Sequence, residues 1–190
     1  MADKLVSPST GKTLIPIGSR TTTPLPENEP KPIHIDREYI EVVVFDSLPR
    51  PASAFGHVAI AIDRTVYSRA HEKYFKGPFR DYLNSNTQKV QRDAIGLHLW
   101  VSPRERKIII DELERRVAID AKYSVFDNSC SSNVADVLEM VGVLAHDPRY
   151  FPTPVSPADL LAVLSKSNRL VERRLYRKGQ SYEGGASGNW

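Results

Sequence analysis

The chain contains a single cysteine, Cys130, and this limits the ways in which its fold can be stabilised. One cysteine cannot form an internal disulfide, and it cannot supply the several thiolates of a cysteine-rich zinc site. With 190 residues, of which 41% are hydrophobic, the chain is long enough for one domain with an apolar core. The sequence also has no His-Glu-x-x-His motif. We therefore expect a fold that is held by packing and that needs neither a metal nor a cofactor.

The net charge of +3 comes from the C-terminal end of the chain. The basic residues there are Lys166, Arg169, Arg173, Arg174, Arg177 and Lys178. A nucleic-acid-binding domain normally carries its basic residues along a folded surface, so we expect no nucleic-acid partner. No stretch approaches the ~18 consecutive apolar residues of a membrane span, so we expect no membrane-spanning segment. Residues 1–8 lack the basic and then apolar pattern of a Sec-type signal peptide, so we expect synthesis in the cytoplasm without that signal.

Composition divides the chain into three parts. Residues 1–36 are rich in proline and polar residues and lack apolar periodicity, which is typical of a flexible leader. Residues 178–190 are rich in glycine and are typical of a flexible tail. We expect the folded domain between them, at residues 37–177.

The folded part has the sequence pattern of an α+β protein. Strands are predicted by β-branched and alternating apolar residues at 38–46, 55–62, 65–68, 97–101 and 170–176, with 55–68 forming a hairpin. The capping box Ser102-Pro103-Arg104-Glu105 predicts a helix to about residue 122, and further helices are expected from Cys130 and from Ser156. We expect residues 69–89 to be a loop-rich insertion. This order favours helices packed on a mostly antiparallel sheet.

Cys130 lies at the predicted start of an amphipathic helix. The apolar residues Val134, Val137, Leu138 and Val141 recur at helical spacing, and Cys130 extends their face toward the helix N-terminus. With Asn128 or Ser129 as the cap, the unpaired N–H groups of the first turn, which includes Ser131, would favour a thiolate and could stabilise an oxyanion. The alternative is that Cys130 is a small buried apolar residue. The polar residues around it, however, would be costly to bury beside an inert side chain.

His57 is the histidine best placed to act as a base for this thiol. It lies in a predicted strand and shares a face with Ala59 and Ala61, while larger apolar residues occupy the other face. The two alanines would leave room for the cysteine helix to approach. The alternative is a histidine that is simply hydrogen-bonded within the core.

These two segments resemble the circularly permuted branch of the NlpC/P60 papain-like superfamily. The resemblance is carried by Gly56-His57-Val58-Ala59-Ile60-Ala61-Ile62, by Val66-Tyr67-Ser68, and by Asn128-Ser129-Cys130 at the start of a helix, and it covers about residues 38–143. In that branch the histidine strand precedes the cysteine helix. Its members include bacterial cell-wall amidases and endopeptidases, lecithin:retinol acyltransferase-like enzymes, and amidase effectors of type VI secretion.

The resemblance implies a papain-like fold with Cys130 as nucleophile and His57 as general base. The family's third polar residue would be Ser68 or His71, unless the site works as a dyad or uses His98. The implied activity is a cysteine amidase or endopeptidase that cleaves peptide amide bonds of peptidoglycan, as an antibacterial type VI secretion effector. Such an effector would act in the periplasm of the target cell, and its expected partners are a cognate immunity protein and a component of the secretion apparatus.

Two other functions stay open from the residues alone. The same permuted fold supports hydrolysis or transfer of lipid acyl groups, for which the aromatic residues of segment 74–82 would form a groove or lid. Alternatively, the chain is a binding module in which Cys130 and His57 are core residues.

Overall fold

The computed structural model describes residues 5–6, 11, 13–14, 36–49, 54–126, 128–146 and 154–182. The chain divides into two units, Met1–His34 and Ile35–Trp190. In the first, strands β1 (Leu5–Val6) and β2 (Thr13–Leu14) pair antiparallel. Apart from these two strands and residues 11 and 36, the predicted leader lies outside the described residues, as do residues 183–190 of the predicted tail.

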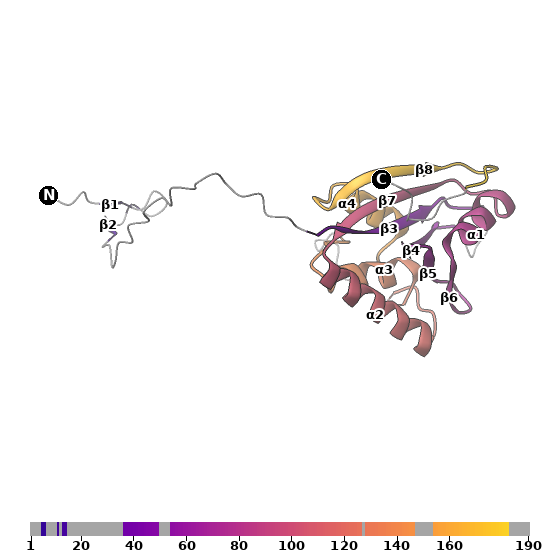
Figure 1. The fold of residues 1–190 in the computed structure, drawn as a ribbon, viewed down its shortest axis with the longest axis horizontal. Helices are drawn as coiled ribbons and strands as arrows, with labels where there is room; N and C mark the ends of the chain where they lie inside the picture. The colour runs from indigo at the N-terminus through magenta and orange to yellow at the C-terminus, as the bar shows by residue number, and fades with distance from the viewer. Residues whose placement is uncertain are drawn as a thin grey trace. The chain divides into compact units, whose positions relative to one another are not determined.

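The second unit is built on a six-stranded sheet in the order β6-β5-β4-β3-β7-β8, in which every neighbouring pair is antiparallel (Figure 1). Its strands are β3 (Glu38–Phe45), β4 (His57–Ile62), β5 (Thr65–Arg69), β6 (Tyr74–Pro78), β7 (Ala94–Val101) and β8 (Leu170–Tyr176). The turn between β4 and β5 places Asp63 at a φ of 54°, a conformation that Asp tolerates in tight hairpins. The predicted α+β class and antiparallel sheet are confirmed.

Four α-helices are described: α1 (Phe79–Asn84), α2 (Pro103–Ile119), α3 (Cys130–Glu139) and α4 (Pro157–Leu164). Helices α2, α3 and α4 each begin with a capping box, in which the side chains of Ser102, Ser129 and Ser156 accept a hydrogen bond from the backbone N–H three residues on. These caps satisfy N–H groups that a helix leaves unpaired at its start. The three predicted helix starts are therefore confirmed. Within the described residues, no helix is both long and apolar enough to cross a membrane.

The two faces of the sheet carry separate apolar clusters. On one face, Val58, Ile60 and Ile62 of β4 pack with residues of α2, α3 and α4. On the other face, Ala59 and Ala61 pack with Phe79 and Leu83 of α1. The expectation that the alanines make room for the cysteine helix is therefore wrong, since α3 lies against the larger residues and α1 covers the alanines.

Segment 69–89 is not the predicted loop-rich insertion. It contains β6, then α1, then a π-helical turn, η2 (Ser85–Lys89). Strand β6 extends the sheet by pairing with β5, with Phe75 opposite Ser68, and Phe79 and Leu83 are fully buried at helical spacing. Gly77 and Pro78 suggest a turn in the sequence, but here they mark the junction of strand and helix.

The described part of the predicted tail is packed against the domain. Asn84 makes two hydrogen bonds with the backbone of Tyr182, at 3.1 Å and 2.8 Å, and Thr87 donates to the carbonyl of Gln180 at 3.0 Å. The ordered contacts therefore continue to Tyr182, past the predicted domain end at residue 177.

Candidate active site

Cys130 is the first residue of α3, and its side chain is 8% exposed. The cap is Ser129 rather than Asn128. Its Oγ accepts from the N–H of Ser132 at 3.2 Å, while Ser132 Oγ accepts from the N–H of Ser129 at 2.8 Å. The positions of Cys130 and Ser131 within the first turn leave their N–H groups outside the helical ladder. Ser131 is buried, and its Oγ lies 3.7 Å from the Cys130 sulfur.

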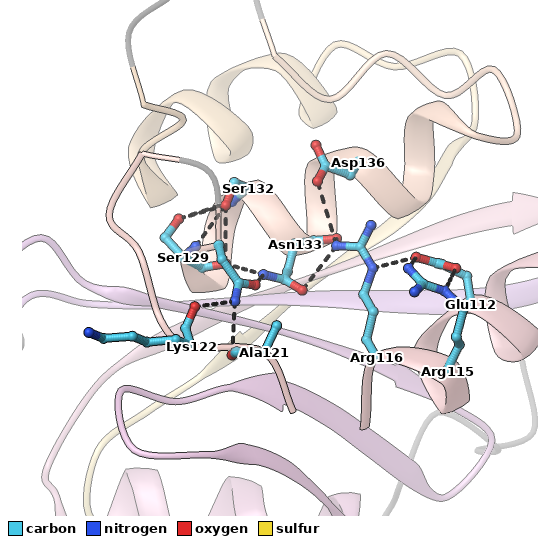
Figure 2. Close-up of polar contacts among 10 residues, drawn as sticks. Glu112, Arg115, Arg116, Ala121, Lys122, Ser129, Ser132, Asn133 and Asp136 are labelled. Carbon is cyan, nitrogen blue, oxygen red and sulfur yellow. Dashed lines mark hydrogen bonds and ion pairs between the residues drawn. The ribbon is translucent and has the colours of Figure 1, made fainter. Parts of the chain in front are cut away.

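The segment that leads into Cys130 is fixed by two asparagines (Figure 2). Asn133 is 2% exposed, and its amide donates to Asn128 Oδ1 at 2.6 Å and to the carbonyl of Ser129 at 2.9 Å. Asn128 in turn donates to the carbonyls of Ala121 and Lys122, at 3.0 Å and 2.6 Å. The chain on either side of the Cys130 turn is therefore tied together through side chains.

Arg116 of α2 connects the same network to the long helix (Figure 2). Its Nη1 donates to Asn133 Oδ1 at 3.0 Å and lies 3.5 Å from Asp136 Oδ2, and its Nε donates to Glu112 at 2.7 Å. Hydrogen bonds from Arg115 and Arg116 hold the pKa of Glu112 at about 2, so its carboxylate is charged throughout the neutral range. An open hollow of about 190 Å³ lies beside this network. That volume is below the ~300–1,000 Å³ of usual ligand pockets.

Arg69 anchors the segment from the sheet. It is 3% exposed, its Nη2 donates to the carbonyl of Ala121 at 2.7 Å, and its guanidinium lies 5.8 Å from the centre of the Tyr123 ring. Asp120, which ends α2 at a φ of 44°, accepts from the N–H of Tyr74 at 2.7 Å. The chain between α2 and α3 is thus bound to both β5 and β6.

His57 begins β4, and its ring is held by two hydroxyl groups. Nε2 lies 2.7 Å from Ser68 Oγ and 2.8 Å from Tyr82 Oη, and these two oxygens lie 2.9 Å apart. Ser68 is on the neighbouring strand β5, and Tyr82 is on α1. Phe45, paired with His57 across the sheet, has its ring centre 6.1 Å from the imidazole.

Burial, with a smaller contribution from the positive charge of Arg92, lowers the pKa of His57 to about 4. Burial also raises the pKa of Tyr82 to about 12, and its hydrogen bond with Ser68 opposes that shift. A negative charge on Cys130 adds to the rise in the Tyr82 pKa, which couples the thiol electrostatically to the hydroxyl cluster. At neutral pH the imidazole is therefore neutral and the phenol keeps its proton.

Three residues were candidates for orienting His57, and one of them, Ser68, contacts its ring. Ser68 contacts His57, whereas His71 packs against Tyr123 with 5.0 Å between ring centres. His98 is buried on β7, with Nε2 3.2 Å from Glu41 Oε2. Glu41 also accepts from the Tyr176 hydroxyl at 2.5 Å.

Among the described residues, the hydrogen-bond contact of the Cys130 sulfur is with Ser131, and none joins it to the His57 ring. Helix α3 packs on the sheet face opposite the one that carries Ser68 and Tyr82, but His57 is the first residue of its strand and lies at the end of the sheet. Cys130 and His57 thus each have a defined set of polar neighbours, but no hydrogen bond between them is found among the described residues. The described residues contain no group of three or more His, Cys, Asp or Glu side chains that could hold a metal.

Sequence reasoning missed Tyr82, Arg69 and the pairing of Asn128 with Asn133. Tyr82 falls in the segment expected to be a loop, although its place three residues after Phe79 and next to Leu83 is a helical signal. The sequence singles out Asn128 as a possible cap of the cysteine helix, and Asn133 only as part of the polar setting of Cys130. Their pairing depends on the turn at the helix start, which the sequence does not specify.

The fold and these sites define an α+β domain with a capped cysteine helix on an antiparallel sheet. Residues 66–167, more than half of the chain, match the family described as the Lnb N-terminal periplasmic domain. The chain belongs to this family. The matched region includes Ser68, Tyr82 and Cys130 and begins after His57. Neither the comparison with curated proteins nor that with solved structures found a match.

Proposed function

We propose that the chain is a papain-like cysteine hydrolase of the permuted NlpC/P60 type that cleaves peptide amide bonds of peptidoglycan. The observation that carries the proposal is the pair of environments at Cys130 and His57. The cysteine lies at a capped helix start, and the contacts that anchor the histidine within the described residues are made through Nε2. A ring anchored through one nitrogen has the other, Nδ1, available for the thiol proton.

The reaction follows the general course of covalent catalysis by a thiol. His57 takes the proton from Cys130, and the sulfur attacks the carbonyl carbon of the scissile amide. The N–H groups of Cys130 and Ser131 stabilise the negative oxygen of the tetrahedral intermediate. His57 then gives its proton to the departing amine, which leaves a thioester. Water, deprotonated by His57, attacks the thioester and releases the acid and the free thiol.

The neutral state of His57 fits a general base that accepts a proton during attack. A pKa of about 4 means that the resting imidazole is neutral and can accept a proton. The reaction requires the sulfur and Nδ1 to approach within ~3.5–4 Å when substrate binds, since catalytic contacts are often loose without substrate. Because Ser68 and Tyr82 hold the His57 ring, the Cys130 side chain at the first position of α3 is the group that would have to move.

The matched family is described as a periplasmic domain, which supports a periplasmic place of action. Peptidoglycan, the proposed substrate, lies in the same compartment. The resemblance to type VI amidase effectors extends the proposal to an antibacterial toxin. In that role the chain would be exported into a target cell and bound by a cognate immunity protein in the producing cell.

The test is the hydrolysis of purified peptidoglycan sacculi by the wild-type chain and by Cys130→Ala. We expect the wild type to release muropeptides with new amine and carboxyl ends, seen by chromatography and mass spectrometry, and Cys130→Ala to release none above background. Ser165→Ala, at the end of α4, is a matched control and should keep full activity. Release by Cys130→Ala at the wild-type rate would overturn the proposal.

A lipid acyl substrate is the second candidate, and exposed apolar side chains favour it. Phe55 precedes His57 and is 80% exposed, while Phe126 precedes Cys130 and is 74% exposed. The segment expected to act as a lid is instead packed, with Tyr74 and Phe79 buried. Hydrolysis of phospholipid vesicles in place of sacculi, lost in Cys130→Ala, would identify this activity.

If both substrates stay intact and iodoacetamide does not alkylate Cys130 at neutral pH, the chain is a binding module.

A further inference from the structure

We propose that Tyr82 is a positioning residue that, together with Ser68, fixes the orientation and tautomer of His57. The proposal rests on the proposed function. Its structural basis is the triangle formed by His57 Nε2, Ser68 Oγ and Tyr82 Oη, whose three sides are 2.7, 2.8 and 2.9 Å long. The Tyr82 hydroxyl therefore contacts both the ring and the serine that orients it.

Ser68 alone is a weak anchor because its hydroxyl has one hydrogen and can rotate freely. Tyr82 supplies a second hydroxyl in a fixed position. Its ring stacks on Phe75 with centres 5.3 Å apart and meets Phe45 edge-on at 5.9 Å, so α1, β6 and β3 together fix where Oη lies. With two contacts at one nitrogen, the ring of His57 has one orientation in which both are kept.

Two hydroxyls also allow His57 to take up a second proton without losing partners. To accept the thiol proton at Nδ1, the neutral ring must carry its own proton on Nε2, and the hydroxyl oxygens of Ser68 and Tyr82 can accept from that N–H. Nε2 keeps this proton when the ring becomes charged, so the same contacts persist after the transfer. A carboxylate in this place would favour the charged ring, whereas the hydroxyl pair is compatible with the neutral ring that burial and Arg92 maintain.

The first experiment measures the ring directly and needs no turnover. The full-length chain is labelled with ¹⁵N-histidine, and the His57 ring nitrogens are followed by NMR between pH 3.5 and 8 in wild type, Tyr82→Phe and Tyr67→Phe. Tyr67 is the matched control because it lies beside Ser68, but its hydroxyl donates to Glu114 at 2.7 Å. We expect one dominant tautomer in wild type and Tyr67→Phe, and averaged tautomer shifts with an altered His57 titration in Tyr82→Phe.

The second experiment measures kcat and KM on solubilised muropeptides. Tyr82→Phe keeps the ring packing and removes one hydroxyl, so we expect kcat to fall on the order of five- to tenfold, the effect of losing one neutral hydrogen bond, with KM unchanged. Ser68→Ala should give a similar loss. The double variant should lose more than either, since the remaining hydroxyl can no longer compensate.

The outcomes separate this inference from the proposed function. If Tyr82→Phe gives the same ¹⁵N shifts and titration as Tyr67→Phe, Tyr82 only packs and the inference is wrong. If those shifts change but no substrate is cleaved by the wild type, the positioning role stands and the hydrolase proposal fails. If the shifts change while kcat on a substrate that the wild type cleaves stays at the wild-type value, the orientation that Tyr82 imposes does not serve the reaction, and its role as a positioning residue for catalysis is overturned.

Discussion

A neutral imidazole held by two hydroxyl groups makes His57 sensitive to acid. Its folded pKa of about 4 lies below the usual 6.5, so between these values the unfolded chain binds the proton more strongly than the folded chain. The free energy of unfolding therefore rises with pH across this window. The contribution is complete above pH 6.5 and is lost as the pH falls toward 4.

Replacing His57 by a residue that does not titrate should remove this contribution. His57→Gln cannot be protonated, so the difference in unfolding free energy between pH 4.5 and pH 7 should be smaller in the variant by roughly 1–3 kcal/mol. Urea unfolding at several pH values measures it. Carboxylates with a lowered pKa, such as Glu112, also contribute less to the unfolding free energy in acid. They are present in both proteins, so their contribution cancels in the comparison. Parallel pH profiles would show that His57 titrates as it does in the unfolded chain.

At the scale of elements, the sequence was most informative where a pattern is local. The capping boxes at Ser102 and Ser156 and the apolar face of α3 depend only on residues within one or two turns, so the starts of these helices could be predicted. The face of the sheet on which α3 packs depends on long-range contacts. The alternation in β4 predicts that Ala59 and Ala61 lie on one face of the sheet and Val58 and Ile60 on the other. It does not predict which helix covers each face.

The same distinction applies to the candidate site. Cys130 and His57 could be singled out from residue type and position, and Ser68 from its place on the next strand. Tyr82 could not, because its relation to His57 arises only when α1 folds back over β4 and β5. Short elements such as β6 and α1 give weak periodic signals, and Gly77 and Pro78 between them are typical of turns.

A prediction at this scale concerns the connection that leads into α3. Asn133→Ala removes both hydrogen bonds that Asn133 donates and the acceptor of Arg116 Nη1. Because Asn133 is buried, we expect a loss of roughly 2–3 kcal/mol in unfolding free energy and faster hydrogen exchange in residues 121–126. Asp136→Asn is the control, since Asp136 is half exposed and lies 3.5 Å from Arg116. Its effect should stay within about 0.5 kcal/mol. Equal effects of the two substitutions would contradict the role given to Asn133.

At the scale of the whole domain, the candidate site depends on elements from both faces of the sheet. The cysteine helix belongs to the larger apolar cluster with α2 and α4, whereas Tyr82 belongs to the layer formed by α1. Helix α1 is short, so its position depends on what packs around it. Residues 179–182 supply part of that support, through Gly179, Gln180 and Tyr182.

The contacts of Tyr182 link the chain beyond β8 to α1 and so to His57. Asn84, at the end of α1, is bonded in both directions to the backbone of Tyr182, whose ring meets Tyr176 edge-on with centres 5.0 Å apart. A chain that ends at residue 177 loses these contacts, whereas one that ends at residue 182 keeps them. We expect the shorter chain to be less stable in urea by on the order of 2 kcal/mol.

Hydrogen exchange distinguishes this support from a general loss of stability. In the shorter chain, exchange should increase most in residues 79–89 and much less in α2, because α2 packs on the opposite face. The His57 ring should then show the averaged tautomer shifts expected of Tyr82→Phe, since Tyr82 is carried by the loosened helix. If the chains ending at 177 and 182 are equally stable and exchange alike, α1 is held by the sheet alone, and the position of Tyr82 is independent of the residues that follow β8.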